Sequence, residues 1–299
     1  MTLRVIEPGL RSTVQDAGRF DHWRSAVPQA GPADPLAFQA ALRLVGNDPL
    51  DAGIEIVGLP FRFTLDVPRL IAVTGRDVTV RTRGTIRGWT SAFARAGEEV
   101  TIAGGERSRF SYLAVSGGIA VAPVLGSRAT YLQAGIGPIP RALAAGDELP
   151  IGPARRGADG AGRTALRSDD SRILVLRGPH ADRVRGAEAL LRGRPYIVSE
   201  SSDRMGVRLE GPPLAPGGAE ILSIGVVPGA VQVPHGGQPI VLLADGQTTG
   251  GYPVVATVTS VDLGRVAQAA PGETLSFYEV DCAAALEALR AVRRWLERL

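Results

Sequence analysis

Short apolar runs separated by turn residues recur along most of this chain. Between 52 and 117 such a run comes about every ten residues, a spacing typical of all-β folds. The pattern predicts a β-barrel or β-sandwich in the first half of the chain, with a further short strand at 3–6. The strands expected in the repeating region lie at 54–57, 61–65, 70–73, 78–81, 100–103 and 110–115.

Helical spacing is clearest just after Asp34. Asp can cap a helix, and Pro35 suits its first position because proline lacks the amide hydrogen that would be unpaired there. Gly46 ends the run. Further helices are expected around 181–191 and at the C-terminal end. The terminal helix is amphipathic and is expected to pack on the barrel or on a partner. Its apolar face comprises Cys282, Ala285, Leu286, Leu289, Val292, Leu296 and Leu299.

The organisation predicted from these patterns is a pair of β-rich domains. A stretch rich in Gly and Arg and poor in apolar residues lies after Ile151 and is the best candidate for a linker. We therefore expect an N-terminal domain at 1–155, a linker at 156–171, and a C-terminal domain at 172–299 that includes the terminal helix. The fold class is mainly β with a few helices.

Composition and charge narrow the functional classes. The chain has 38 glycines and 22 prolines but only 5% aromatic residues, which favours turn-rich β structure. Its net charge is +3, and the arginines are dispersed among acids, so nucleic-acid binding is weakly supported. No apolar run is long enough to predict a membrane span. A single cysteine, Cys282, and the lack of a signal peptide predict a reducing, cytoplasmic location.

All 33 basic residues are arginine. The absence of lysine excludes a Schiff-base lysine, a P-loop lysine and a Ser-Ser-Lys amidase site. It also excludes a biotin-carrying lysine on this chain. The three histidines lack the neighbouring ligands that metal sites use, so no metal is expected.

The stretch from Val198 to Thr259 holds the strongest candidates for a site, because polar, glycine-rich turns there join apolar runs. The loop from Asp245 to Gly251 is the most informative of these turns. Its paired glycines let backbone amides approach a ligand, and amides aimed at a developing oxyanion suit acyl or carboxyl transfer. An ordinary glycine-rich hairpin has the same pattern.

Charged residues in the same stretch allow two further interpretations. Asp203 and Arg204 put a carboxylate beside a guanidinium, which suits either a planar carboxylate substrate or a structural ion pair. His235 lies on a glycine-flanked loop and is either functional or an exposed turn residue. A Ser-His-Asp triad would require Ser201 or Ser202, but no nucleophile-elbow sequence supports it.

Three long blocks carry a resemblance to a known family. They are STVQDAGRFDHW with the following VPQAGPADPLAFQAALRLVGN, then SSDRMGVRLEGPPL, and finally GAVQVPHGGQPIVLLADGQTTGGYPVVATV. In this order they resemble the allophanate-hydrolase subunit 2 family. That family includes the C subunit of bacterial 5-oxoprolinase and the C-terminal half of the urea amidolyase carboxyltransferase domain. The likeness extends from about Gly9 to Val280.

The resemblance implies two cyclophilin-like β-barrel domains and a site near the contact with a homologous subunit 1. It favours the C subunit of an ATP-dependent 5-oxoprolinase, which works with subunit 1, of the 5-oxoprolinase B type, and with the A subunit. ATP would be used by the complex, not necessarily bound by this chain. One alternative is a biotin-dependent carboxyltransferase subunit, with biotin carried by another chain. The other is a non-catalytic regulatory partner of a kinase-inhibitor-like subunit 1.

Under the favoured interpretation, eleven residues form the site. Gln247 and the backbone amides of Gly250 and Gly251 would polarise a lactam carbonyl, and Arg204 would hold the substrate carboxylate. The residues expected to be catalytic are Asp245, Gln247, Thr248 and His235. Those expected to bind substrate are Asp203, Arg204, Gln232, Thr249, Gly250, Gly251 and Tyr252.

Overall fold

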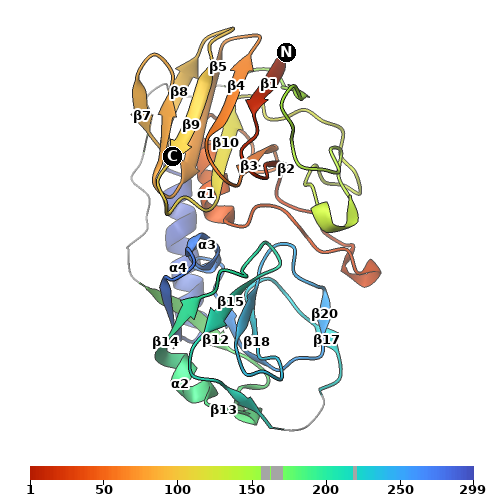
Figure 1. Ribbon diagram of the computed structural model, residues 1–299, viewed down its shortest axis with the longest axis vertical. Coiled ribbons are helices and arrows are strands. Elements are labelled where there is room, and N and C mark those ends of the chain that lie inside the picture. The colour runs from red at the N-terminus through yellow and green to blue at the C-terminus, as the bar shows by residue number, and fades with distance from the viewer. Residues whose placement is uncertain (156–161, 163–170, 218–220) are drawn as a thin grey trace. The chain divides into compact units, whose positions relative to one another are not determined.

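The structure, a computed structural model, describes residues 1–155, 162, 171–217 and 221–299 (Figure 1). Strands predominate in these residues, and four α-helices are present, so the mainly β fold class is confirmed. The predicted linker lies outside the described residues, apart from Gly162 and Ser171.

The chain divides into two compact units. The first comprises Met1–Phe20, Ala30–Ala165 and Trp295–Leu299, and the second comprises Asp21–Gln29 and Leu166–Arg294. The domain boundaries expected from the sequence remain a prediction, because both units also take in short segments from elsewhere in the chain.

Two antiparallel sheets form the first unit. The outer, six-stranded sheet has the order β11 (Glu148–Pro150), β1 (Thr2–Glu7), β4 (Phe61–Leu65), β9 (Val100–Gly104), β6 (Val78–Arg81) and β7 (Thr85–Arg87). The five-stranded sheet has the order β2 (Thr13–Gln15), β3 (Gly53–Ile56), β10 (Ser111–Val115), β5 (Arg69–Gly75) and β8 (Thr90–Ala94). A 3-10 turn, Leu132–Ala134, lies in the loop before β11.

The facing sides of these sheets form one hydrophobic core. Phe61 and Val80 contribute to it from the six-stranded sheet, and Ile54, Ile71 and Leu113 contribute from the five-stranded sheet. Period-2 alternation explains the outer sheet, where β4 buries every second residue.

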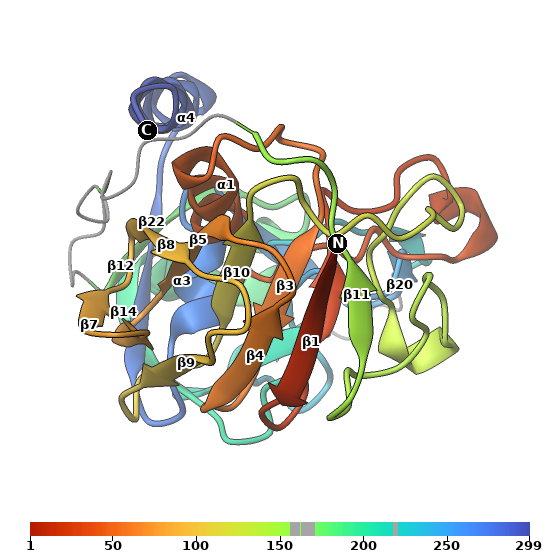
Figure 2. The same cartoon turned by 90° about the horizontal axis from the view of Figure 1, so that it is seen from above.

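The helix α1 (Pro35–Leu44) covers the other face of the five-stranded sheet, as Figure 2 shows. Asp34 caps it, as predicted, by accepting a hydrogen bond from the Ala37 amide at 3.1 Å. Phe38 packs edge-on against Tyr112 with 5.8 Å between ring centroids. Because both faces of this sheet are covered, β5 is buried along its whole length.

The second unit is a closed seven-stranded barrel. Around the barrel the strands follow the order β12 (Arg172–Arg177), β21 (Val254–Val258), β18 (Ala230–Gln232), β19 (Ile240–Leu242), β15 (Gly206–Glu210), β14 (Arg192–Val198) and β22 (Thr274–Glu279). The last strand, β22, returns to pair with the first, β12, in parallel. Two short ribbons accompany the barrel. They are β13 (Val184–Arg185) with β16 (Ala215–Pro216), and β17 (Ile224–Gly225) with β20 (Thr249–Gly250).

The helix expected around 181–191 is split, so that prediction was only partly right. The chain forms a 3-10 turn at Ala181–Arg183, then β13, and then α2 (Ala187–Leu191). Gly186 separates them with a φ of 95°, a left-handed conformation that interrupts a helix. A 3-10 turn at Trp23–Ser25 and the helix α3 (Leu263–Gln268) complete the short elements of this unit.

The predicted terminal helix is α4 (Cys282–Leu296). Ala285, Leu289, Val292 and Leu296 are half-buried, as expected for the inner side of an amphipathic helix. Cys282 and Leu286, which the sequence placed on the same face, are exposed. The buried face is therefore narrower at the start of the helix than predicted.

Candidate functional site

The predicted site loop follows β19 and leads through β20 to β21. Its start is fixed by the backbone of residues 204–205. The Leu243 amide donates to the Met205 carbonyl at 2.9 Å, and the Asp245 amide donates to the Arg204 carbonyl at 3.1 Å. The neighbouring barrel strands β15 and β19 thus hold two of the sequence blocks side by side at their ends.

Arg204 and Asp245 also join these segments through their side chains. The Arg204 Nε atom lies 2.8 Å from Asp245 Oδ2, and Nη2 lies 3.1 Å from Oδ1. The two side chains are only 6% and 4% exposed. Of the two roles considered for Arg204, this geometry is that of a structural ion pair. Contact with a substrate carboxylate would require the pair to open.

Asp203, the acid next to Arg204 in sequence, has a different role. Its Oδ1 accepts hydrogen bonds from the Met205 and Gly206 amides at 2.9 and 3.2 Å. This carboxylate therefore fixes the turn into β15, and it does so in an exposed position.

Gln232 and Gln247 meet in the centre of the site. Gln247 Nε2 donates to Gln232 Oε1 at 2.9 Å. Gln232 is 1% exposed, and its own Nε2 is buried with no hydrogen-bond partner among the described residues. The pairing of β18 with β21 shifts register between Val231 and Gln232, an irregularity of the kind that re-aims side chains next to sites.

The ribbon β17–β20 places Gly250 against these two amides. Ile224 pairs with Gly250, and the Val226 amide donates to the Thr248 carbonyl at 3.0 Å. A β-carbon on Gly250 would lie 2.7 Å from Gln232 Nε2 and 3.6 Å from Gln247 Nε2. Only glycine fits here without displacing an amide.

The remaining predicted residues lie around this centre in different environments. Thr248 is buried, whereas Thr249 is exposed. Gly251 lies near Ile221, whose carbonyl would be 3.4 Å from a β-carbon at position 251.

His235 and Tyr252 form an aromatic contact in the same unit. Their rings meet edge to face at 6.0 Å, and both residues are exposed. Together these two side chains offer an accessible imidazole next to a partly exposed phenol.

The Ser-His-Asp triad considered from the sequence does not form in the described residues. Ser202 Oγ exchanges hydrogen bonds with the Arg208 backbone at 3.0 and 3.3 Å. Asp203 and Asp245 are engaged as described above, so neither is placed to orient His235.

His180 is a buried histidine with a structural contact. Its Nδ1 accepts a hydrogen bond from the Val254 amide at 3.1 Å, which leaves the hydrogen of the neutral ring on Nε2. Burial, assisted by Arg183, lowers the pKa of this imidazole. The ring is therefore held in its neutral form.

A second polar cluster lies in the first unit, where the sequence patterns predicted no site. Gln15, Asp16 and Arg19 all bind the segment 124–130: Asp16 Oδ1 accepts from Ser127 Oγ at 2.6 Å, and Arg19 Nη2 donates to the Ala129 carbonyl at 2.8 Å. Arg19 is fully buried, and burial lowers the pKa of its guanidinium, with Asp16 opposing this. The sequence signal that could have pointed to this cluster is the QDAGR run, which contains all three residues and lies in the first block of the family resemblance.

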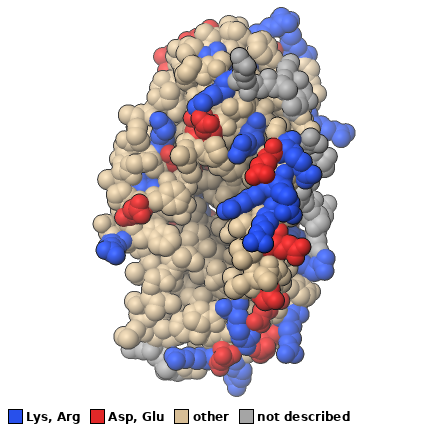
Figure 3. Space-filling model, turned by 180° about the vertical axis from the view of Figure 1, so that it is seen from behind, with Lys and Arg blue, Asp and Glu red and all other residues tan. Residues whose placement is uncertain are grey.

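Among the described residues, no group of three or more His, Cys, Asp or Glu could hold a metal ion. No helix in the described part of the chain is long and apolar enough to cross a membrane. On the face seen in Figure 3, arginine and acidic side chains are interspersed along one side, beside a broad uncharged area. A basic stripe of the kind that binds nucleic acid is not visible on that face.

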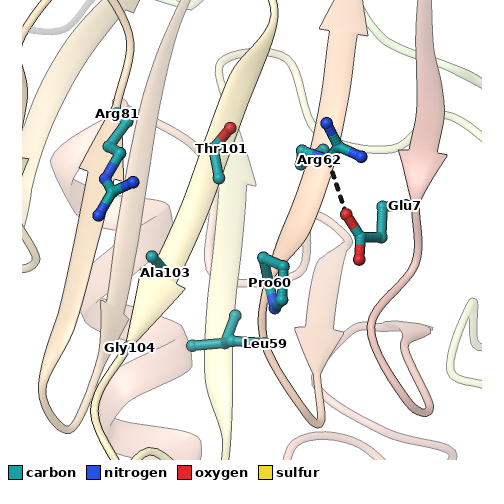
Figure 4. Close-up of a pocket in the computed structure, with 8 residues that line it drawn as sticks. All are labelled: Glu7, Leu59, Pro60, Arg62, Arg81, Thr101, Ala103 and Gly104. Atoms are coloured by element: carbon teal, nitrogen blue, oxygen red, sulfur yellow. Dashed lines mark hydrogen bonds and ion pairs between the residues drawn. The ribbon is translucent and has the colours of Figure 1, made fainter.

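A shallow hollow of about 370 Å³ lies on the outer face of the six-stranded sheet (Figure 4). Neighbouring strands place Arg62, Thr101 and Arg81 in one row across it. Arg62 is occupied by ion pairs with Glu7 and Glu99. None of the predicted site residues lines this hollow, which belongs to the first unit.

Comparisons with known proteins place the whole chain in one family. It is 37% identical to the C subunit of 5-oxoprolinase from Escherichia coli, over 99% of this chain and 97% of the relative. It is 33% identical to the protein of the same name in Haemophilus influenzae, over 99% of this chain and 96% of the relative. The fold matches the crystal structure of K. lactis urea amidolyase with a TM-score of 0.91 and 26% identity, over 99% of this chain and 20% of that one.

The family match covers the candidate site entirely. Residues 25–279 match the family described as carboxyltransferase domain, subdomain A and B, a range that includes the Arg204–Asp245 pair and the Gln232–Gln247 pair. The relatives, which align over almost their whole length, and the fold match agree with this family. The chain belongs to the carboxyltransferase domain, subdomain A and B, family.

Proposed function

We propose that this chain is the C subunit of an ATP-dependent 5-oxoprolinase, which opens 5-oxoproline to L-glutamate together with the A and B subunits. The observation that carries the proposal is the end-to-end likeness to the C subunit of Escherichia coli 5-oxoprolinase, 37% identical over 97% of that relative. Two urea amidolyases that resemble this chain, from Lachancea kluyveri and Saccharomyces cerevisiae, match it over only 17% and 16% of their own length.

The chemistry of the site suits an amide substrate. When a lactam opens, water adds to the carbonyl carbon, the carbon–nitrogen bond breaks and the ring nitrogen takes a proton. Negative charge develops on the carbonyl oxygen as the water adds, and N–H donors about 3 Å away stabilise it. Gln247 and the Gly251 amide are the donors we assign to this oxygen, whereas the Gly250 amide, expected from the sequence as a further donor, is engaged in the antiparallel pairing of Gly250 with Ile224.

The buried ion pair supports the loop that carries these donors. We assign Arg204 and Asp245 to positioning, because each charge is occupied by the other and the pair connects the start of the loop to the turn that enters β15. His235 and Tyr252 are the accessible polar aromatic groups nearest in sequence to the loop, and we assign them to the rim where the substrate or another subunit enters.

ATP is assigned to the complex. The chain has no Walker-type loop and no lysine, so a phosphate site of that kind would have to come from another subunit. The partners we propose are the homologous subunit 1, of the 5-oxoprolinase B type, and the A subunit. The cytoplasmic location expected from the sequence remains a prediction.

The alternative function is a biotin-dependent carboxyltransferase, which the family description and the urea amidolyase fold match favour. Biotin would then be carried by another chain, because this one has no lysine to carry it. The loop amides would stabilise the oxyanion of carboxyl transfer by the same physical means.

Reconstitution separates the two functions. The A and B subunits and this chain are purified singly, mixed in all combinations and supplied with 5-oxoproline and ATP, and glutamate and phosphate are measured. Glutamate released only by the full mixture supports the proposal. Loss of carboxyl groups from a carboxybiotin carrier upon addition of urea, with no glutamate formed from 5-oxoproline, would favour the carboxyltransferase.

A further inference from the structure

The two glutamine amides at the centre of the site can do more than polarise a carbonyl. We propose that Gln232 orients Gln247 so that the Gln247 amide recognises both hydrogen-bonding groups of a cyclic amide: its Oε1 accepts from the ring N–H, and its free N–H donates to the ring carbonyl. This inference rests on the proposed function and specifies how that site selects its substrate class.

The hydrogen bond between the two amides sets the orientation of the Gln247 amide relative to that of Gln232. A carboxamide has two N–H donors on one side and an acceptor oxygen on the other. Because Gln247 Nε2 donates to Gln232 Oε1 at 2.9 Å, a half-turn of the Gln247 amide would set two oxygens against each other. One N–H is thereby committed, and the other N–H and Oε1 have no partner among the described residues.

The two amides do not use up each other's hydrogen-bonding capacity. In a reciprocal amide pair, Gln232 Nε2 would donate back to Gln247 Oε1. That return bond is absent, since Gln232 Nε2 has no partner in the described part of the chain and is buried. Gln247 is half-buried, so the edge of its amide that carries Oε1 can contact a ligand while the buried Gln232 accepts a hydrogen bond from Nε2.

Gly250 makes this arrangement possible. A β-carbon at this position would come within 2.7 Å of Gln232 Nε2, closer than real side chains pack. The ribbon pairing of Ile224 with Gly250 holds the backbone there. The Gln232 amide therefore keeps its place only because position 250 has no side chain.

The edge that Gln247 presents is complementary to an amide in the cis form. In a five-membered lactam the ring forces the N–H and C=O onto the same side, where one carboxamide can bind both. Peptide bonds between ordinary residues are trans and direct these groups to opposite sides, so they can satisfy only one of the two. The site then selects lactams, and also urea-like groups, over a single trans amide.

The same barrel contains a glutamine that binds an N–H and a C=O together. Gln238 accepts from the Gly211 amide and donates to the Gly211 carbonyl, both at 3.0 Å. This contact shows that a side-chain amide on this scaffold can make two hydrogen bonds to one small group. Gln238 also supplies a matched control, because its amide is already occupied.

The test compares two small ligands that differ at one atom. 2-Pyrrolidone has the lactam N–H and C=O, whereas γ-butyrolactone keeps the carbonyl and replaces N–H with oxygen. Their dissociation constants are measured by ligand-observed NMR titration of the reconstituted complex. Loss of one hydrogen bond, with an acceptor left unpaired, should make the lactone bind about tenfold more weakly to the unaltered complex.

Three variants test which residues produce the preference for 2-pyrrolidone over γ-butyrolactone. Gln247→Met should reduce the tenfold ratio to about one. Gln232→Met should also reduce it, because the Gln247 amide is then free to turn; a merely structural effect would weaken both ligands equally. Gln238→Met should leave the ratio unchanged. Melting temperatures of all three variants establish that they are folded.

Each outcome decides the inference separately from the proposed function. A ratio near one in the unaltered complex, or a ratio that survives Gln247→Met, overturns the lactam recognition even if 5-oxoproline is turned over. A tenfold ratio that Gln247→Met abolishes supports it, even if the complex opens no 5-oxoproline and the proposed function fails.

Discussion

Arg204 and Asp245 lie 41 positions apart and form a two-point ion pair that is almost completely buried. The pair connects the turn that enters β15 to the loop that carries Gln247 and Gly250. Two charges at such a position stabilise the fold only while both are present, because either one alone would be buried without compensation.

Removing one partner should therefore be costly. We expect Asp245→Asn to lower the free energy of unfolding by about 3–5 kcal/mol, because the Arg204 guanidinium remains buried with its charge uncompensated. Urea unfolding followed by circular dichroism measures this. The double variant Arg204→Met with Asp245→Leu should lose less than Asp245→Asn. A loss below about 1 kcal/mol in Asp245→Asn would mean that the pair is exposed in solution.

Gln247→Ala should lower turnover of the reconstituted complex by about 10²–10³-fold if its N–H stabilises the developing oxyanion. The side chain is half-buried on a loop, so the melting temperature should change little. Turnover and melting temperature are measured on the same preparation. Full turnover would falsify the oxyanion role, whereas a large drop in melting temperature would show that the loop is structural.

Gly250→Val should be more harmful than Gln247→Ala. Its β-carbon would lie 2.7 Å from Gln232 Nε2, and its branched side chain would further crowd both amides. We expect loss of turnover together with a lower melting temperature. Gly225→Ala is the matched control on the partner strand of the ribbon, since nothing lies within 4 Å of a β-carbon there. Similar effects from both variants would argue against crowding at position 250.

The lowered pKa of His180 predicts a pH dependence of stability. The folded chain holds this imidazole neutral, so the unfolded chain binds a proton more readily. The stabilisation that the neutral imidazole gives to the folded state is fully present above the ordinary pKa of 6.5. It is lost as the pH falls from there through the lowered pKa of the folded state. Urea unfolding at a series of pH values from 8 to 5 measures the loss. His180→Asn, which can still accept from the Val254 amide, should show a smaller decline over this range.

The isolated chain should be inactive and should bind the homologous subunit 1. We expect a stable complex of the two that buries more than about 1,000 Å². Co-purification and size-exclusion chromatography at micromolar concentrations measure complex formation. Elution of the two proteins as separate species under these conditions would contradict the prediction.

Elements that depend on local pattern could be read from the sequence. Strands β4 and β6 have the predicted bounds, because alternating apolar residues between turns leave little choice of register. The cap of α1 was equally local, since Asp34 and Ala37 are three residues apart. By contrast, a single glycine with positive φ, Gly186, divided the helix expected around 181–191.

The side-chain partners in the site could not be read in this way. In the sequence Arg204 stands beside Asp203, yet its ion pair is with Asp245, because the pairing of β15 with β19 brings those ends together. The contact of Gln232 with Gln247 likewise depends on the irregular register of β18. Such contacts follow from barrel topology, which the order of apolar runs does not specify.

The parallel pairing of β12 with β22 has a consequence for how this protein is made. Arg172 pairs with Ser276, so the first strand of the barrel receives one of its neighbours only after almost the whole second half of the chain has left the ribosome. Until then β12 has an unpaired edge, the kind of surface that recruits strands from other chains. Closing a ring through so distant a contact is also slow. Correct folding of the second unit therefore requires β22 to pair with β12 before a strand of another chain binds to that edge.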